Sequence, residues 1–336
     1  MELRRDPVSL RWVIQADASA SLSRTPCPLC PGQEHLTPQT LYERRSGSGQ
    51  WLLRVTPHPR PRYRIEGLPE RRGEGLYDKM RNLGAHEIVT ESPEHDRSLA
   101  QLGEEQVAEV VRAIVTRMAD LKKDPRFRYV SVFRTHGSGV ELEHPHSQIT
   151  ALPFVPRPLV EELRSAKRHF EGKERCLFCD MIQQEMEQRV RTVDWNEAFV
   201  AFCPFASRAP YETWIFPVKH RCCFEEDLTD WNGQRRLARM LKSLVARIEK
   251  IAPSYRMVLH TAPNTKAKFE KPDHWTSLEH DFHWHLEILP EALPRPASIL
   301  PEVYYNSVPP EAAALRLREL AVSEEDKAPP RPGSSA

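Results

Sequence analysis

Residues 144–149 read His-Pro-His-Ser-Gln-Ile, and residues 283–288 read His-Trp-His-Leu-Glu-Ile. In both stretches two histidines separated by one residue lead into an aliphatic run, a pattern typical of a β-strand. A short motif can recur by chance. The sequence on either side therefore decides whether the two stretches belong to two copies of one structural unit.

The segments that precede the two histidine pairs match one another in order and in kind. Each half has a Cys-x-x-Cys pair, an aromatic and aliphatic run, a strand leading to a histidine, an amphipathic helix and a further strand. These segments are 27–30, 51–55, 87–95, 107–121 and 129–133 in the first half, and 176–179, 199–202, 212–220, 237–251 and 256–259 in the second. The sequence therefore predicts a duplicated α+β fold, in which antiparallel strands of both halves join in one sheet with helices packed on it.

The length of 336 residues accommodates two such units. We place them at 1–165 and 166–323, with the chemistry in the first. The tail at 324–336 is rich in proline and small residues and has little to bury, so we expect it to be disordered.

The composition favours no highly charged partner. Lys and Arg total 48 against 47 for Asp and Glu. The net charge therefore gives no indication that the main partner is nucleic acid or an anionic membrane. No apolar run approaches about 18 residues, and the opening Met-Glu-Leu-Arg-Arg-Asp lacks the apolar centre of a signal peptide. We expect a cytoplasmic protein that binds neither nucleic acid nor membrane.

Four of the seven cysteines form the two Cys-x-x-Cys pairs. In a chain of this size such pairs favour metal binding, with a redox pair or two buried thiols as the alternatives. Zinc prefers four thiolate and imidazole ligands. If the halves are equivalent, the first site consists of Cys27, Cys30, His95 and His144, and the second of Cys176, Cys179, His220 and His283. Cys222 and Cys223 lie close enough in sequence to His220 to compete for the second metal.

His146 is the predicted nucleophile. Strand alternation places residues 144, 146 and 148 on one face, where they can converge on a phosphate. A nucleophilic histidine needs a neutral attacking nitrogen, which it has when its other ring nitrogen donates to a fixed acceptor. Attack on the α-phosphorus would give a nucleotidyl-histidine, and Gln148 could donate to the phosphate oxygens. The second half has Glu287 in place of Gln148, and because a carboxylate repels phosphate we interpret His285 as a supporting residue.

These motifs resemble those of the galactose-1-phosphate uridylyltransferase family of the histidine-triad superfamily. The resemblance extends from Glu2 to about Pro290 and includes residues 4–7, 27–34, 85–87, 91–95 and 203–206. It implies a duplicated histidine-triad-like fold, nucleotidylation of His146, phosphate binding by Gln148 and zinc at the first Cys₂His₂ site.

The resemblance also implies further site residues and a homodimer. The loop at 135–143 would contact the nucleotide phosphates, so we add Thr135, Gly137 and Ser147 to the predicted substrate-binding residues. The second site resembles that of a plant ADP-glucose phosphorylase. The enterobacterial type uses a carboxylate and three histidines, which would correspond here to Glu162, His260, His283 and His285. The second metal could be iron rather than zinc.

Three functions remain open. The first is a nucleotidyltransferase that moves a nucleoside monophosphate between sugar 1-phosphates, as in galactose-1-phosphate uridylyltransferase. The second is a phosphorylase or hydrolase of the same superfamily, such as an ADP-glucose phosphorylase-like adenylyltransferase with phosphate as acceptor. Hydrolases usually carry a third histidine at the position of Gln148. The third is a zinc-stabilised nucleotide-binding protein without turnover, favoured by the acidic Glu141 in the 135–143 loop. The 297–306 segment leaves the sugar open.

Overall fold

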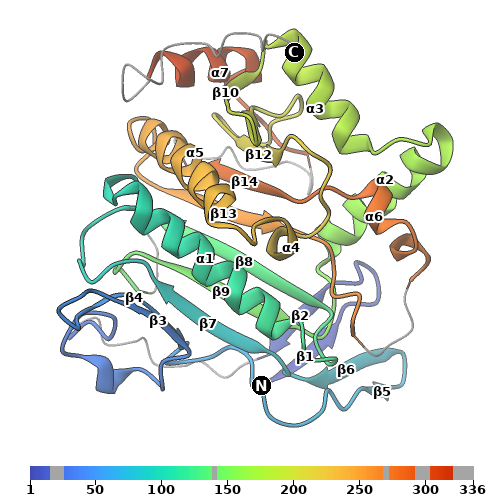
Figure 1. Ribbon diagram of the computed structural model, residues 1–336. Coiled ribbons are helices and arrows are strands. Elements are labelled where there is room, and N and C mark those ends of the chain that lie inside the picture. The colour runs from blue at the N-terminus through green and yellow to red at the C-terminus, as the bar shows by residue number, and fades with distance from the viewer. Residues whose placement is uncertain (16–25, 138–141, 268–271, 292–302, 321–336) are drawn as a thin grey trace.

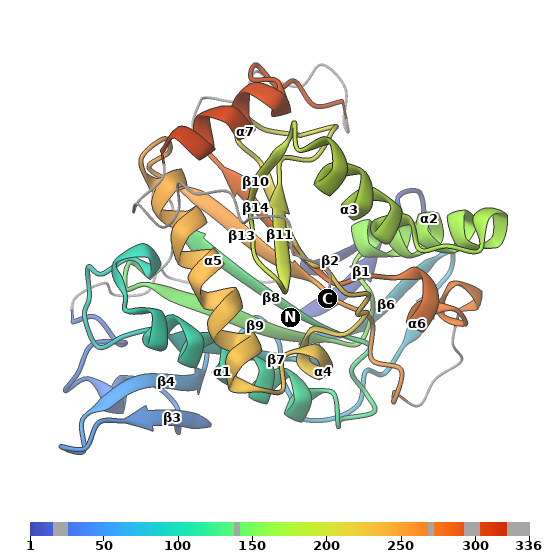
Figure 2. The same cartoon turned by 45° about the horizontal axis from the view of Figure 1, so that its top comes forward.

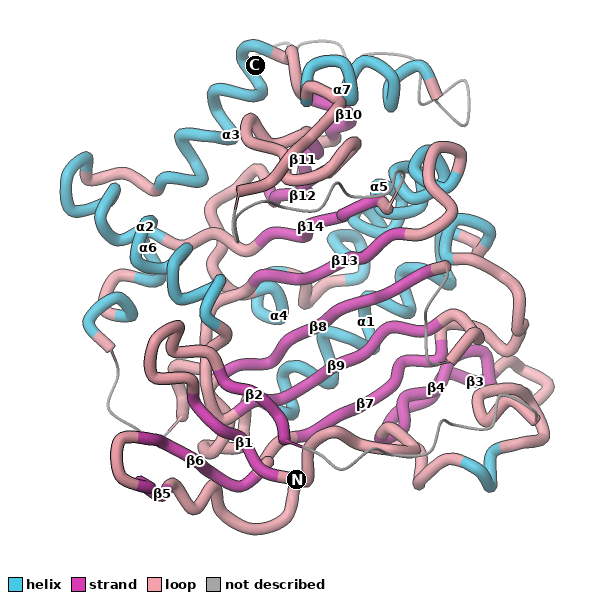
Figure 3. Tube along the Cα trace, turned by 180° about the vertical axis from the view of Figure 1, so that it is seen from behind, coloured by secondary structure: helices cyan, strands magenta, loops and turns pink. Residues whose placement is uncertain are grey.

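The computed structural model describes residues 1–15, 26–137, 142–267, 272–291 and 303–320. The main sheet has ten strands in the order β10-β11-β12-β14-β13-β8-β9-β7-β4-β3 (Figure 3). Its strands are β3 (Tyr42–Arg45), β4 (Trp51–Pro57), β7 (Ala85–Thr90), β8 (Tyr129–His136), β9 (His146–Leu152), β10 (Thr192–Trp195), β11 (Phe199–Phe202), β12 (Thr213–Pro217), β13 (Tyr255–His260) and β14 (His285–Pro290). All neighbouring strands in it pair antiparallel.

The strand order is symmetric about the centre of this sheet. Outward from the centre, the first half contributes β8, β9, β7, β4 and β3, and the second contributes β13, β14, β12, β11 and β10. Strands of the same rank in the two halves thus occupy equivalent positions. β8 and β13 pair directly, with Val132 opposite Leu259 and His136 opposite Tyr255. The predicted duplicated α+β fold with one shared antiparallel sheet is confirmed.

Two long helices cover one face of the sheet and lie side by side, α1 (Glu104–Leu121) and α5 (Trp231–Glu249) (Figure 1). The apolar residues that predicted them are buried against the strands and against each other, among them Val111, Met118 and Leu241. The periodicity therefore identified both helices and the face that each one buries.

The other face of the second half is covered by α2 (Arg157–Lys173) and α3 (Leu177–Gln188), with α6 (Leu278–Asp281) beside α2 (Figure 2). A second core lies here, where Leu163 and Phe178 pack with Phe216. The short helix α4 (Phe224–Asp227) packs against α1, and α7 (Pro310–Glu319) contacts β10 and α5. Three 3₁₀ turns, η1 (Glu34–Leu36), η2 (Leu99–Gln101) and η3 (Asp273–Trp275), complete the helical elements of the described residues.

A separate four-stranded sheet has the order β2-β1-β6-β5. Its strands are β1 (Glu2–Arg5), β2 (Trp12–Gln15), β5 (Arg72–Glu74) and β6 (Tyr77–Arg81). Among the described residues, no helix is both long enough and apolar enough to cross a lipid bilayer. The predicted disordered tail at 324–336, Glu141, and residues 297–302 of the 297–306 segment lie outside the described residues.

Candidate active site and metal clusters

β9 carries the predicted nucleophile at its first residue. His146 is 5% exposed, and its Nε2 lies 3.1 Å from Nε2 of Gln148 on the same face of the strand. His144 lies outside β9, so residues 144, 146 and 148 do not share one strand as the alternation predicted. Pro145 explains the difference, because proline has no N–H to donate to a strand ladder.

The hydrogen bonds of His146 leave its outer nitrogen free of a proton in the neutral ring. Its Nδ1 lies 2.8 Å from the carbonyl oxygen of His144. A carbonyl only accepts, so Nδ1 carries the hydrogen and Nε2 carries the lone pair. This is the tautomer that the sequence predicted for a nucleophilic histidine.

Ser147 faces the opposite side of β9. It is 3% exposed, and its hydroxyl donates to Glu91, whose carboxylate is paired with the guanidinium of Arg134 at 3.0 Å. Arg134 lies opposite Ser147 in the ladder, and Thr135 and Gly137 follow at the end of β8. Gly137 has φ +93°, and a Cβ there would lie 2.4 Å from Cβ of Ser254, so the backbone requires glycine. Contact between substrate and Thr135, Gly137 or Ser147 stays a prediction.

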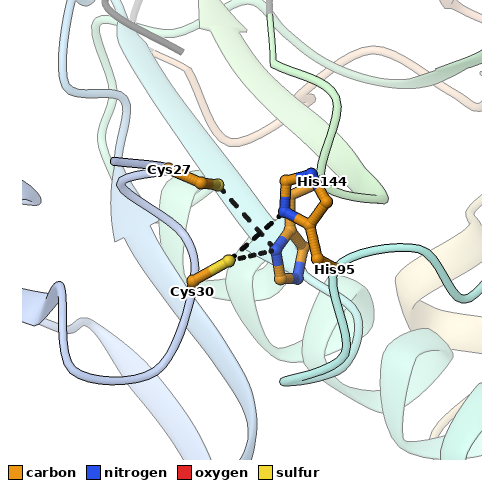
Figure 4. A group of neighbouring side chains, drawn as sticks. All are labelled: Cys27, Cys30, His95 and His144. Atoms are coloured by element: carbon orange, nitrogen blue, oxygen red, sulfur yellow. Dashed lines mark hydrogen bonds between the residues drawn. The ribbon is translucent and has the colours of Figure 1, made fainter. Parts of the chain in front are cut away.

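The first predicted metal set brings together four residues from three separate segments, the Cys27–Cys30 turn, His95 and His144 (Figure 4). Cys30 Sγ lies 3.2 Å from His95 Nδ1 and 3.6 Å from His144 Nδ1, and Cys27 Sγ lies 4.0 Å from His144 Nδ1. Zinc bonds of about 2.3 Å to sulfur and 2.1 Å to nitrogen would place these atoms about 3.6 Å apart at a tetrahedral angle. The distances therefore fit a tetrahedral zinc ion.

The outer nitrogen of His144 supports the same reading. Nε2 lies 2.8 Å from the carbonyl oxygen of Ser92, so it donates and leaves the Nδ1 lone pair directed at the cysteines. Burial lowers the pKa of His144, which favours the neutral, ligating ring. Burial also raises the pKa of the Cys30 thiol to about 11, so a cation is needed for this thiol to ionise near neutral pH.

The second predicted set also comes together. Cys176 caps the N-terminus of α3 and Cys179 lies in its first turn, so a helix presents both sulfurs. Cys179 Sγ lies 3.3 Å from His220 Nδ1 and 3.6 Å from His283 Nδ1. His220 Nε2 donates to the carbonyl of Glu279 at 3.1 Å. All four ligand atoms lie within 4.8 Å of one another.

A third group of possible ligands lies next to the second set. The four residues of the enterobacterial alternative are divided between these two clusters. His283 belongs to the Cys₂His₂ set, whereas Glu162, His260 and His285 group with Glu287. His260 Nδ1 lies 2.9 Å from Glu162 and its Nε2 lies 3.8 Å from Glu287. Burial alone would lower the pKa of His260, but the carboxylates of Glu162 and Glu287 raise it to about 9.

Arg208 supplies a further positive charge in this third group. Its guanidinium pairs with Glu287 and with the buried Glu212. The position equivalent to Gln148 in the first half is therefore occupied by a carboxylate that already has a cationic partner. The role of His285 as a supporting residue rather than a second nucleophile stays a prediction.

Two stacked histidines, one of which contacts Gln148, received no role from the sequence. His86, in β7, has Nε2 at 2.8 Å from Oε1 of Gln148, and its ring stacks on His58 with the centroids 4.3 Å apart. β7 and β9 are adjacent in the sheet, and Ile88 lies opposite Gln148. Only the strand register brings His86 to Gln148, and the register is not readable from the sequence.

Comparisons with known proteins agree with this arrangement. Residues 13–156 match the family model for galactose-1-phosphate uridyl transferase, N-terminal domain. The galactose-1-phosphate uridylyltransferase of Streptomyces lividans is 32% identical over 71% of this chain and 70% of its own length. The enzyme of the same name from Thermotoga maritima is 29% identical over 96% of this chain and 99% of its own length.

A solved structure extends the likeness to the whole fold. The crystal structure of an ADP-glucose phosphorylase from Arabidopsis thaliana with bound ADP-glucose superposes with a TM-score of 0.76 and 28% identity, covering 96% of this chain and 100% of that one. Its fold thus spans both halves described above. The chain belongs to the galactose-1-phosphate uridylyltransferase family of nucleotidyltransferases.

Proposed function

We propose that this protein transfers a nucleoside monophosphate between sugar 1-phosphates through a covalent intermediate on His146, as a UDP-glucose–hexose-1-phosphate uridylyltransferase. The observation that carries the proposal is the contact of His146 Nδ1 with the carbonyl of His144, which leaves the Nε2 lone pair beside the amide of Gln148. His146 supplies the nucleophile, and two residues further along the same face of the strand Gln148 supplies an uncharged hydrogen-bond donor for the phosphate. This pair suits attack on an anionic substrate.

In the first step His146 Nε2 attacks the α-phosphorus of the nucleotide sugar. A nitrogen–phosphorus bond forms, the bond between phosphorus and the sugar phosphate oxygen breaks, and the sugar 1-phosphate leaves. Nδ1 keeps its hydrogen bond to the carbonyl of His144, which stabilises the positive charge on the ring. Gln148 Nε2 donates to a non-bridging oxygen, where charge grows in the transition state.

In the second step a phosphate oxygen of the acceptor sugar 1-phosphate attacks the same phosphorus. The bond to His146 breaks, the new nucleotide sugar forms and the neutral ring returns. One site thus serves donor and acceptor in turn, and ping-pong kinetics should result. Thr135, Gly137 and Ser147 remain in the proposal as substrate-binding residues.

Two Zn²⁺ ions per chain belong to the proposal, at the two Cys₂His₂ sets, with iron as the alternative in the second. Both sets have the ligand types that zinc prefers, and His144 and His220 donate their outer nitrogens to backbone carbonyls. Zinc there would supply structural stability and hold His144 next to His146. The third group, with Glu162, has Arg208 as a cationic partner, so we assign no metal to it.

We also propose a homodimer in the cytoplasm and a division into units at 1–165 and 166–323. The boundary lies within α2. The described residues include seven cysteines without a disulfide, as a reducing compartment would maintain. Size-exclusion chromatography with light scattering would test the dimer.

The proposed function is tested by intact-mass spectrometry after incubation with UDP-glucose or ADP-glucose. Wild-type protein should gain the mass of one nucleoside monophosphate, and His146→Ala should not. His285→Ala, the counterpart in the second half, is the matched control and should still be labelled. Labelling of the His146→Ala variant would refute His146 as the nucleophile, and loss of zinc or of folding in that variant would show that His146 had been mistaken for a ligand.

A second candidate is an adenylyltransferase with inorganic phosphate as acceptor, like an ADP-glucose phosphorylase. The similarity to the Arabidopsis thaliana structure with bound ADP-glucose favours it. The same mass experiment separates the two, because an adenylyl adduct formed from ADP-glucose and discharged by phosphate identifies the phosphorylase. Absence of any adduct, including after rapid quenching, would favour a nucleotide-binding protein without turnover.

A further inference from the structure

His86 is linked to the proposed nucleophile through a continuous set of hydrogen bonds. The backbone N–H of Arg62 donates to Nδ1 of His86 at 3.3 Å. On its other side His86 Nε2 lies 2.8 Å from Oε1 of Gln148, and Gln148 Nε2 lies 3.1 Å from Nε2 of His146. His146 Nδ1 meets the carbonyl of His144.

The two ends of this set fix the direction of every bond in it. A backbone N–H can only donate, so Nδ1 of neutral His86 accepts and its hydrogen lies on Nε2. That hydrogen points at Gln148, which must therefore present its carbonyl oxygen to His86. The amide NH₂ group of Gln148 is then directed at Nε2 of His146. This is consistent with the other end of the set, because the carbonyl of His144 accepts from His146 Nδ1 and leaves a lone pair on Nε2.

The opposite orientation of the Gln148 amide would be unfavourable at both contacts. It would place N–H against N–H at His86, and oxygen lone pair against nitrogen lone pair at His146. It would also turn the amide oxygen toward the phosphate, where an acceptor repels an anion. The fixed tautomer of His86 thus decides whether Gln148 offers the phosphate a donor or an acceptor.

The surroundings hold the His86 ring in place. His86 is 5% exposed and stacks on His58, with an angle of 15° between the rings. The backbone N–H of His58 donates to the carbonyl of His86 at 2.8 Å, and the N–H of Arg60 donates to Nδ1 of His58 at 3.0 Å. Burial, together with the neighbouring rings of His86 and His146, lowers the pKa of His58 to about 3, so the stacked partner stays neutral.

We propose that His86 is a positioning residue that locks the side-chain amide of Gln148, so that its NH₂ group meets His146 in the unliganded protein and donates to the α-phosphate when the Nε2 lone pair of His146 attacks. The inference rests on the proposed function, because it assigns the phosphate to this site. It identifies a contribution from β7 to a reaction whose nucleophile lies on β9.

Two amide substitutions of His86 that differ in side-chain length test the proposed positioning role. His86→Gln places an amide near the former Nε2 and can still donate to Gln148, whereas His86→Asn reaches only the former Nδ1. We expect His86→Asn to slow formation of the nucleotidyl adduct by about 10- to 100-fold in kcat with little change in KM, because a transition-state donor is lost. His86→Gln should stay within about threefold of wild type, less than the effect of a typical single hydrogen bond.

A double-mutant cycle separates positioning from general damage. If His86 acts through Gln148, adding His86→Asn to Gln148→Ala should slow the reaction no further. Independent, multiplicative losses in the double variant would overturn the proposal, and so would a wild-type rate in His86→Asn. Melting temperature and zinc content of each variant establish that the fold is retained.

A measurement on the unliganded wild-type protein tests the inference without activity. Long-range ¹H–¹⁵N spectra of protein with ¹⁵N-labelled histidine should show His86 protonated at Nε2, and resonance assignment of the wild-type protein identifies its signal. A hydrogen on Nδ1 would overturn the proposal even if every variant fails to fold. If wild-type protein forms no adduct with any donor, the proposed function fails. The tautomer of His86 then still tests whether His86 fixes the orientation of the Gln148 amide.

Discussion

At the scale of single residues, the proposed nucleophile His146 lies beside a serine that contacts a buried ion pair. Next to His146, the side chain of Ser147 points into the molecule and donates to Glu91 at 2.8 Å. Glu91 and Arg134 are 0% and 1% exposed at the side chain, and Arg134 also donates to the hydroxyl of Tyr255 from β13. Any change in this pair acts on the strand that carries His146.

Replacing Arg134 with methionine should therefore be costly. The substitution leaves the carboxylate of Glu91 buried without its cation, for which we expect a loss of about 3–5 kcal/mol in the free energy of unfolding. Ser147→Ala is the matched control on the same carboxylate and should cost only about 1 kcal/mol, the value of one hydrogen bond. Urea denaturation measures the free energy of unfolding of both variants. Equal losses would contradict the larger contribution expected from the ion pair.

The raised pKa of His260 predicts a pH dependence of stability. Because Glu162 and Glu287 raise this pKa to about 9, the folded protein binds a proton that the unfolded chain releases at its ordinary value of 6.5. This contribution is complete below the unfolded pKa and is lost as pH rises through about 9. The free energy of unfolding should fall between neutral and alkaline pH, and Glu162→Gln should weaken that fall. An unchanged slope in the variant would show that other groups cause the pH dependence.

At the scale of elements, the two zinc candidates are built differently beside equivalent strands, with His95 and His220 after β7 and β12 and His144 and His283 before β9 and β14. In the first set the Cys-x-x-Cys pair forms a turn, with the N–H of Cys30 donating to the carbonyl of Cys27. In the second set the pair lies at the start of α3, so the sulfurs also anchor that helix against the segments that carry His220 and His283.

Cys179→Ser should consequently release the second metal and loosen α3. We expect metal content to fall from two ions per chain to one, with a loss of stability of about 4 kcal/mol or more, since lost metals are among the largest single effects. Cys222→Ser is the matched control. It replaces another partly buried thiol near His220 outside the four-ligand set, and it should keep two ions. Metal analysis with thermal unfolding decides, and an unchanged metal content in Cys179→Ser would refute the second site.

The elements that the sequence predicted are those with a strong internal pattern. The segments 199–202 and 237–251 correspond to β11 and α5, because alternation or helical spacing follows directly from a buried face. The small sheet went unpredicted because its strands are short and largely exposed. α2 was missed because it buries only Leu159, Leu163 and Ala166.

The candidate site also has features that the sequence predicted and features that it did not. Both Cys₂His₂ clusters could be predicted because the repeat pairs residues far apart in sequence, and the role proposed for His146 comes from its motif. The contacts of His86 and the third group of Glu162, His260, His285 and Glu287 could not be predicted, since they depend on which residues face each other across neighbouring strands.

At the scale of the whole molecule, the halves share their interior. β8 pairs with β13, and α1 packs against α5. Polar bonds also cross this boundary. Lys122 donates to the carboxylate of Glu225 at 2.6 Å and to the carbonyl of Ala262, and Asn264 donates to the carbonyls of Lys122 and Phe127. Separating the halves would expose the β8 edge, the inner faces of both helices and buried charges.

The two halves should consequently unfold in one cooperative transition, and the proposed unit 1–165 should not fold alone. An unpaired β8 is an open strand edge, and Lys122 and Glu225 would each lose a buried partner. We expect the isolated fragment 1–165 to aggregate or to lack protected amides in β8, and co-expression with the remainder, residues 166–336, to restore both. Lys122→Met in the intact chain should cost about 3–5 kcal/mol while preserving a single transition. Two separate unfolding steps, or hydrogen-exchange protection of β8 in the isolated fragment, would show that the halves are independent domains joined by a tolerant interface.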